Sequence, residues 1–508
     1  MPVVLHVVQP TTGGVARVVL DLLRDQVAGG LRPALLCPPT GPLAPTARAL
    51  GATVLPWPAG REPGPGLARE TAGVLRAVEA LSPRLIHLHS AKAGLAGRLA
   101  LRGRYPTVFQ PHAWSFEAAG PLRPVAARWE RHAVRWTHRL LWVSERERAA
   151  GLDAGVVADG AVIPNGVDTA HFTPLDSAAR RGVRAGLHAV HAVPPRAPLV
   201  VCVGRLSRQK GQDVLLRAWP RVSRRLPGAR LVLVGDGPAG EALRIAAPRG
   251  VLFAGAVDDP RPWYAAADLV VQPSRWEGMA LTPLEAMACG RPVLLTDVAG
   301  ARECLPEEHL ASCLVPPGDP RALASATVGL LADPAARVAL GVAARRRVRR
   351  DHDLRGTAAA VRELYRTLLP DLPAPGTDPT DGGDGSGAPD PVVLPAPVPA
   401  SLPVPVSHGR AGGVVPGSAG RGPETGAGAG PGAVTRPGAV TGAGNNPAPP
   451  VGPVGPGGIG GRPGLPAGAR VFLRRPRGVV PGRLPPGPHP TVRAGQTPPV
   501  ADGEAGGR

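Results

Sequence analysis

The amino-acid sequence predicts an α/β protein of two doubly wound domains facing a cleft, followed by a disordered C-terminal tail. Short β-branched runs alternate with helical patterns in two successive series, which is typical of parallel βαβ units. Beyond about residue 370, the chain of 508 residues turns to Pro, Gly, Ala and Val with almost no aromatic side chains. In doubly wound sheets, ligands bind at the carboxyl ends of the strands.

The first series predicts a domain over residues 1–170. Its strand candidates are VVLHVV (3–8), PALLC (33–37), LIHLH (85–89), TVFQ (107–110) and LLWVS (140–144). Residues 171–196 carry several prolines and no strand pattern, so we expect them to connect the two domains.

The second series predicts a domain over residues 197–354. Its strand candidates are PLVVCVG (198–204), RLVLVG (230–235), VLFAG (251–255), DLVVQ (268–272) and PVLLT (292–296). A helix over 355–370 is expected to close the ordered part. Prolines and glycines throughout 371–508 predict the disordered tail. Its basic segment RVFLRRPRG (470–478) is either a contact for anionic surfaces or a solvated patch without function.

The chain carries 58 basic and 38 acidic residues, a formal charge of +20. Such an excess suggests anionic partners such as nucleotides, phospholipid headgroups or nucleic acid. A genomic preference for arginine explains it equally well, because Lys92 and Lys210 are the only lysines. The five cysteines form no CxxC pair, which favours reduced thiols in a cytoplasmic protein. We expect neither signal peptide nor membrane span, hence a protein that is soluble or peripheral on the inner face of the membrane.

A glycine pair, Gly13 and Gly14, follows the first predicted strand. Glycines here let backbone amides approach an anion at a helix N-terminus, although any tight βα turn also favours glycine. The segment lacks the GxGxxG pattern of dinucleotide-binding proteins, which argues against a dehydrogenase.

A basic loop, GRLSRQKG (204–211), lies between a strand and a helix of the second series. Arg205 offers a bidentate fork and Lys210 a mobile point charge, a combination suited to a diphosphate. Spacing alone is also compatible with a solvated basic turn.

Two glutamates flank the start of a later helix in SRWEGMALTPLEAMACG (274–290). Glu277 is expected in the turn and Glu285 on the helix, with Pro283 in its first turn, where proline is tolerated. Two carboxylates so placed can bind separate hydroxyl-bearing parts of one ligand, and free amides between them can bind phosphate oxygens.

Together these motifs make the chain, over residues 1–369, resemble glycosyltransferase family 4, retaining enzymes with the GT-B architecture. The residues that carry the resemblance are VIPNGVD (162–168), VGRLSRQKG (203–211), LVLVGDGP (231–238) and EGMALTPLEAMACGRPVLLTD (277–297), the last with the family's E-x7-E spacing.

The resemblance implies a role for each site residue. Arg205 and Lys210 would bind the donor diphosphate and stabilise the leaving group. Glu277 would hold the donor sugar and Glu285 the ribose. The remaining donor contacts would come from the amides of Met279, Ala280 and Leu281 and, across the cleft, from Gly14.

His112, in QPHAW (110–114), matches the family's histidine near the sugar, although it is also compatible with a hydrogen-bonded histidine at a strand end. The family often has Phe and Gly at Met279 and Ala280, so the identity of the donor sugar is open. The segment IHLHSAKAG (86–94) is either an acceptor contact or a plain strand-to-helix turn.

The activity implied is transfer of a sugar from a nucleoside-diphosphate sugar to a hydroxyl acceptor, in exopolysaccharide or cell-envelope glycan synthesis. The acceptor could be a lipid-linked glycan at an anionic membrane surface, since the first domain is rich in arginine. No metal or other cofactor is expected. The alternatives are a sugar-nucleotide epimerase of related fold and a basic nucleic-acid-binding protein, although stacking aromatics are too few for the latter.

Overall fold

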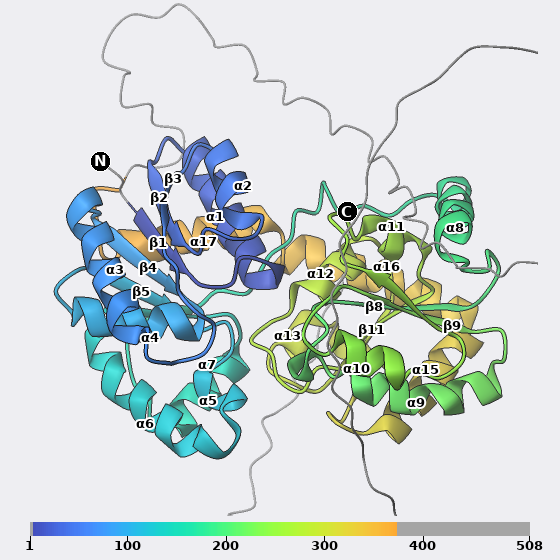
Figure 1. Ribbon diagram of the computed structural model, residues 1–508. Helices are drawn as coiled ribbons and strands as arrows, with labels where there is room; N and C mark the ends of the chain where they lie inside the picture. The colour runs from blue at the N-terminus through green and yellow to red at the C-terminus, as the bar shows by residue number, and fades with distance from the viewer. Residues whose placement is uncertain (1–3, 373–508) are drawn as a thin grey trace, which may run out of the picture. The chain divides into compact units, whose positions relative to one another are not determined.

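The computed structural model describes residues 4–372 and contains two parallel sheets (Figure 1). The predicted tail lies outside the described residues, apart from Asp371 and Leu372. The first sheet has seven strands: β1 (Val4–Val8), β2 (Pro33–Cys37), β3 (Thr53–Pro56), β4 (Leu85–His89), β5 (Thr107–Gln110), β6 (Arg139–Trp142) and β7 (Gly160–Val162). The second has six: β8 (Leu199–Val203), β9 (Arg230–Val234), β10 (Val251–Gly255), β11 (Leu269–Gln272), β12 (Val293–Thr296) and β13 (Leu314–Val315). The predicted fold class is confirmed.

All ten predicted strands are present, within one or two residues at their ends. The structure adds β3, β7 and β13, which the sequence analysis missed. Each is an edge strand of its sheet, and each is short. Edge strands are paired on one side alone, so their sequences need no long buried run and give a weak pattern.

The strand orders are β3-β2-β1-β4-β5-β6-β7 and β10-β9-β8-β11-β12-β13. The order reverses between β1 and β4 in the first sheet and between β8 and β11 in the second. Loops that leave these strand pairs diverge and leave a ligand-binding crevice at the carboxyl ends of the strands. The predicted glycine pair follows β1, and the basic loop and Glu277 follow β8 and β11.

Helices cover the faces of both sheets, as Figure 1 shows. The first domain contains α1 (Gly13–Ala28), α2 (Leu43–Ala49), α3 (Leu67–Leu81), α4 (Ser90–Leu101), α5 (Ser115–Ala118), α6 (Arg123–Ala133) and α7 (Glu145–Asp153). Later helices are α8 (Ser177–His191), α9 (Gln212–Arg225), α10 (Gly240–Ile245), α11 (Arg261–Ala266), α12 (Leu281–Ala288), α13 (Ala301–Cys304), α14 (Leu310–Cys313), α15 (Pro320–Ala332), α16 (Pro334–Asp351) and α17 (Leu354–Arg366). Short 3-10 helices are η1 (Gly120–Leu122), η2 (Val134–Trp136), η3 (Arg208–Lys210) and η4 (Glu307–His309).

The segment expected to connect the domains contains α8, which Asp176 caps by accepting hydrogen bonds from two backbone amides. Arg180 and Arg184 of α8 both pair with Asp268, next to β11, so α8 packs on the second domain. Helix α17, orange in Figure 1, instead lies against α1 of the first domain. The Tyr365 hydroxyl lies 2.7 Å from His87 Nδ1 on β4.

Among residues 4–372, no single helix has both the length and the apolar composition of a membrane span. Helices α15 and α16 reach that threshold only as a pair bent by 100°.

Candidate active site

The predicted donor residues come together at the carboxyl edge of the second sheet. Gly211, which ends the loop after β8, has a φ of +66°. A Cβ atom there would lie 2.0 Å from the carbonyl oxygen of Pro273, so the loops after β8 and β11 touch through their backbones. This close approach, which needs glycine, places Lys210 beside the loop that carries Glu277.

Lys210 and Glu277 form a direct ion pair, with 2.6 Å between Nζ and Oε1. The Ser274 hydroxyl donates to the same carboxylate oxygen at 2.7 Å, and the Gln209 amide lies 3.4 Å from the other. The resemblance gave Lys210 and Glu277 different parts of the donor.

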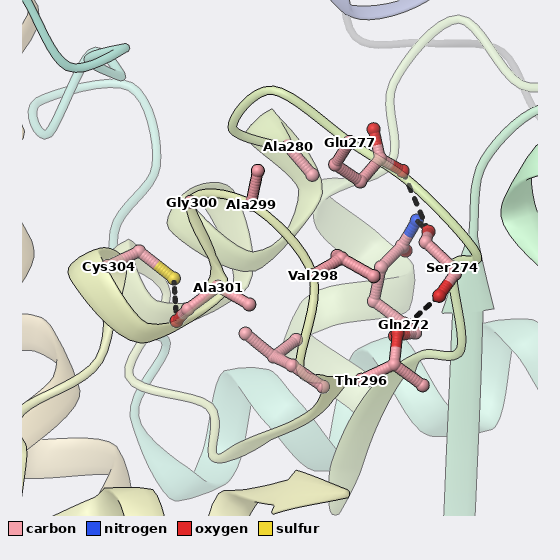
Figure 2. A pocket seen from close by; sticks show the side chains of 11 residues that line it. Gln272, Ser274, Glu277, Ala280, Thr296, Val298, Ala299, Gly300, Ala301 and Cys304 are labelled. Carbon is pink, nitrogen blue, oxygen red and sulfur yellow. Dashed lines mark hydrogen bonds between the residues drawn. The ribbon is translucent and has the colours of Figure 1, made fainter. Parts of the chain in front are cut away.

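Figure 2 shows the polar side chains of Gln272, Ser274 and Thr296 below Glu277. They line an internal space of about 10 Å³, which is about the volume that one water molecule needs. Gln272 Oε1 is buried there without a hydrogen-bond partner. This space is therefore too small to hold a sugar. The polar side chains around it support the Glu277 loop.

Arg205 lies in the loop after β8 with its side chain partly exposed. Gly237, in the loop after β9, has a φ of +156°. A Cβ atom there would lie 2.9 Å from Arg205 Cγ. Burial, and then the nearby charge of Arg61, lower the pKa of Arg205 below its usual value. The Arg205 guanidinium makes no hydrogen bond or ion pair within residues 4–372, so its charge is available to an anion.

Helix α12 begins at Leu281 without a side-chain cap, so its first amides keep the donor capacity that the phosphate-cradle prediction requires. Gly300 packs on this segment, because a Cβ there would lie 2.5 Å from the Gly278 carbonyl oxygen. A Cβ on Gly14 of the first domain would lie 3.9 Å from Leu281 Cγ. The glycine loop after β1 therefore lies at the start of α12.

Glu285 projects from α12 and is buried, and the Tyr264 hydroxyl donates to its Oε2 at 2.6 Å. Burial raises the pKa of Glu285, and the Tyr264 hydrogen bond opposes that rise. Sequence reasoning missed Tyr264 because it belongs to α11, a separate helix. The only local signal was a tyrosine in the short segment RPWYAA (261–266).

His112 lies after β5 with a φ of +57°, and the next residue, Ala113, also has a positive φ. Glu147 of α7 accepts hydrogen bonds from the backbone amides of Ala113 and Val143, at 2.7 and 2.8 Å. A Cβ on Gly278 would lie 3.0 Å from the Ala113 nitrogen, so the His112 and Glu277 loops are in contact. Sequence reasoning missed Glu147, which holds this left-handed turn in place.

Two buried histidines, His89 and His6, continue inward from His112. His89 Nδ1 lies 3.2 Å from His112 Nε2, His89 Nε2 lies 2.9 Å from His6 Nδ1, and His6 Nε2 lies 3.0 Å from Gln26 Oε1. Because Gln26 Oε1 can only accept, the chain favours a proton on the ε nitrogen of each ring. Burial lowers the pKa of His112 to about 3 and that of His6 to about 4, so both rings are neutral near pH 7.

The nitrogens of His6, His87 and His89 lie within 4.8 Å of one another, close enough to consider a metal ion. No carboxylate belongs to this group, and a dication buried among three neutral rings would lack a counter-charge. Each ring also has a hydrogen-bond partner on another element. The arrangement fits a hydrogen-bonded chain better than a metal centre.

Lys92 is buried inside the first domain. Its ammonium pairs with Glu70 at 2.8 Å, and both side chains are almost fully buried. His87 and His89 are also fully buried. Two interpretations were open for residues 86–94, an acceptor contact or a plain strand-to-helix turn. The burial of these side chains fits the turn.

The fold and this arrangement of cations, carboxylates and an uncapped helix start define a two-domain nucleotide-sugar enzyme. The family model described as "Glycosyltransferase Family 4" matches residues 12–171, and "Glycosyl transferases group 1" matches residues 197–333. The chain therefore belongs to glycosyltransferase family 4, as predicted, and is a glycosyltransferase. Neither alternative, the epimerase nor the nucleic-acid-binding protein, is favoured by these matches.

The names of similar proteins also describe glycosyltransferases. D-inositol 3-phosphate glycosyltransferase 2 of Catenulispora acidiphila is 32% identical over 372 residues, which are 66% of this chain and 84% of that protein. The lipopolysaccharide core mannosyltransferase LpcC of Rhizobium leguminosarum is 35% identical over 220 residues, 41% of this chain and 60% of LpcC. The match thus spans less than two thirds of LpcC.

Solved structures show the same fold. HepE of Anabaena, in complex with UDP and glucose, superimposes with a TM-score of 0.62 at 22% identity, covering 73% of this chain and 100% of HepE. WaaG, a glycosyltransferase involved in lipopolysaccharide biosynthesis, superimposes with a TM-score of 0.56 at 17% identity, covering 71% of this chain and 99% of WaaG.

Proposed function

We propose that the protein transfers a glycosyl unit, with retention at the anomeric carbon, from a nucleoside-diphosphate sugar to a hydroxyl of a growing glycan. The observation that carries the proposal is the Lys210–Glu277 pair at 2.6 Å, beside the uncapped start of α12 and the unpaired Arg205. One diphosphate-linked sugar can satisfy all of these groups, with phosphates on the cations and hydroxyls on the carboxylate.

In this mechanism, negative charge grows on the diphosphate as the glycosidic bond of the donor breaks. Arg205, Lys210 and the amides of Met279, Ala280 and Leu281 are in place before the reaction, so they stabilise this charge more in the transition state than in the ground state. These groups supply the positive charge for which other enzymes use a metal ion, so we propose that none is required.

The acceptor hydroxyl attacks from the face that the leaving group occupies, and its proton passes to the leaving phosphate. Glu277 holds the sugar hydroxyls and forms no covalent bond to the sugar. Glu285 binds the ribose, with Tyr264 fixing its carboxylate. Neutral His112 lies near the sugar and contributes a hydrogen bond without charge.

The donor proposal predicts stabilisation of the full-length chain by one nucleoside diphosphate among UDP, GDP, ADP and dTDP. At a hundredfold excess over the dissociation constant, binding raises the free energy of unfolding by about 2.7 kcal/mol, which thermal denaturation detects. Relatives that depend on GDP-mannose and neighbours that bind UDP make these two the first to test.

Glu285→Ala and Lys210→Ala are expected to lose the shift, whereas Glu241→Ala, an exposed carboxylate on α10, should keep it. A cooperatively melting protein that none of the four nucleotides stabilises would contradict the proposal.

We further propose a lipid-linked acceptor in exopolysaccharide or cell-envelope synthesis, reached at an anionic membrane surface. Leu122 and Val125, before and within α6, are each 65% exposed, and Arg123 and Arg128 beside them are exposed. Such a mixture of apolar and cationic side chains suits the headgroup region of a bilayer.

Vesicles containing phosphatidylglycerol are expected to sediment the full-length chain at low salt. Arg123→Gln/Arg128→Gln should weaken the binding roughly 30-fold, at about 1 kcal/mol for each arginine. A wild-type protein that stays in the supernatant would refute the membrane location and leave the donor proposal unaffected.

A further inference from the structure

A second concentration of positive charge lies on the opposite edge of the second sheet from the donor site. A cavity of about 470 Å³ is bounded there by α16, the C-terminal end of α12 and the residues that precede β11 and β12. It is lined by a single carboxylate, Asp268, and by six arginines: Arg180, Arg291, Arg337, Arg345, Arg346 and Arg349.

The walls of this cavity are fixed by a close backbone contact. A Cβ on Gly341 of α16 would lie 2.3 Å from the carbonyl oxygen of Gly290, which follows α12. Only glycine allows α16 to rest directly on that turn. Three turns of α16 therefore present their side chains at a set distance from the end of the donor helix.

The single carboxylate is already neutralised. Asp268 pairs with Arg180 at 2.6 Å and with Arg184 at 2.7 Å, and it accepts the Leu199 amide at 2.8 Å. Burial opposes these partners, yet they hold the pKa of Asp268 below its usual value. Within residues 4–372, the other five lining arginines form no ion pair with a carboxylate.

Three of those five bind backbone carbonyls at helix ends. Arg345 donates to Ala288, Arg291 to Cys289 and Arg337 to Leu330 and Leu331. These carbonyls carry partial negative charge and offset part of the cationic charge. Each guanidinium has five N–H donors and uses only one or two of them here, so donors are left for a ligand.

Arg346 and Arg349 are exposed, and neither makes a hydrogen bond or ion pair within residues 4–372. Two valines at the rim, Val338 and Val342, are 69% and 54% exposed. The cavity thus combines unpaired cations with an apolar edge.

We propose that this cavity is a second anion site, separate from the donor site, whose ligand carries a phosphate group with at least two negative charges. Guanidinium groups match phosphate oxygens in pairs, and a ligand of that charge would offset the crowded arginines. The apolar rim suits carbon attached to the phosphate. Either the headgroup of an anionic lipid or a free phosphorylated molecule offers this chemistry.

Calorimetric titration of the full-length chain with inorganic diphosphate tests the site. We expect two binding sites in the wild type. Arg346→Gln/Arg349→Gln should weaken one of them about ten-fold or more, because hydrogen bonds to charged groups are removed. Lys210→Ala should abolish the other, which separates this site from the proposed donor site.

The matched control is Arg221→Gln/Arg225→Gln, which removes the same charge from exposed positions on α9 of the same domain. It should leave both sites within two-fold of the wild type. Unchanged binding of diphosphate and of vesicles by Arg346→Gln/Arg349→Gln would overturn the proposal.

A second arm identifies the source of the phosphate. Vesicles of phosphatidylcholine are sedimented with and without phosphatidic acid, whose phosphate monoester can carry two negative charges. The proteins compared are the wild type, the α16 variant Arg346→Gln/Arg349→Gln and the α9 control. Loss of vesicle binding in the α16 variant alone assigns a lipid headgroup. Loss of diphosphate binding with vesicle binding intact assigns a free phosphorylated ligand.

Discussion

Lys210→Ala is expected to lower kcat for glycosyl transfer by about 10²–10³-fold, the effect of removing one group that stabilises transition-state charge. The Lys210 ammonium lies 2.6 Å from the Glu277 carboxylate, beside the proposed diphosphate site. Its loss also leaves the buried Glu277 carboxylate without its cation. Transfer of sugar from the donor identified by thermal denaturation is the measurement.

The neighbouring Arg208→Ala is the control, because Arg208 is exposed and belongs to the same short helix, η3. We expect its kcat to fall less than three-fold. The double variant Lys210→Ala/Glu277→Gln should show effects that are far from additive, since the two residues are one unit. A Lys210→Ala enzyme with more than a third of the wild-type kcat would remove Lys210 from the mechanism.

Glu130→Leu is expected to destabilise the protein by about 3–5 kcal/mol, because it leaves a buried arginine without its partner. Arg98 on α4 is fully buried and donates to Glu130 on α6 at 2.7 Å. It also donates to the Gly94 carbonyl and packs on the Phe109 ring at 4.0 Å. Denaturant unfolding of the full-length chain measures the loss.

The double variant Arg98→Met/Glu130→Leu should recover much of that loss, since a well-packed apolar pair avoids the cost of burying two charges. The control is Arg128→Ala, an exposed arginine of α6, which should change the free energy of unfolding by less than about 0.5 kcal/mol. An equal loss of unfolding free energy in Glu130→Leu and Arg128→Ala would show that the buried Arg98–Glu130 pair does not stabilise the fold.

Arg98 also corrects an expectation from composition. The expectation of an anionic membrane surface rests on the arginines of the first domain, namely Arg98, Arg102, Arg104, Arg123, Arg128, Arg131, Arg135 and Arg139. Arg98 is inside the domain, and Arg104 binds the carbonyls that end α4. Charge counted along a sequence does not separate arginines that face solvent from those consumed by internal partners.

The sequence alone was sufficient to predict the two βαβ series. Buried parallel strands need continuous β-branched runs, and the intervening helices need an apolar stripe. It also placed Arg205, Lys210, Glu277 and Glu285 correctly on loops and helix at one edge of the second sheet. In a doubly wound fold, the residues that follow the strands next to the switch point meet at one place.

Only the tertiary structure decided which side chains meet. Tyr264 reaches Glu285 from another helix, Glu147 fixes the His112 turn, and His6 joins His89 across neighbouring strands. The edge strands and the arginine cavity between α12 and α16 also follow from contacts between distant segments. A local sequence pattern indicates whether a segment prefers helix or strand. Contacts between distant segments depend instead on packing distances, such as the close approach of α16 to Gly290 that Gly341 allows, and no local pattern encodes these distances.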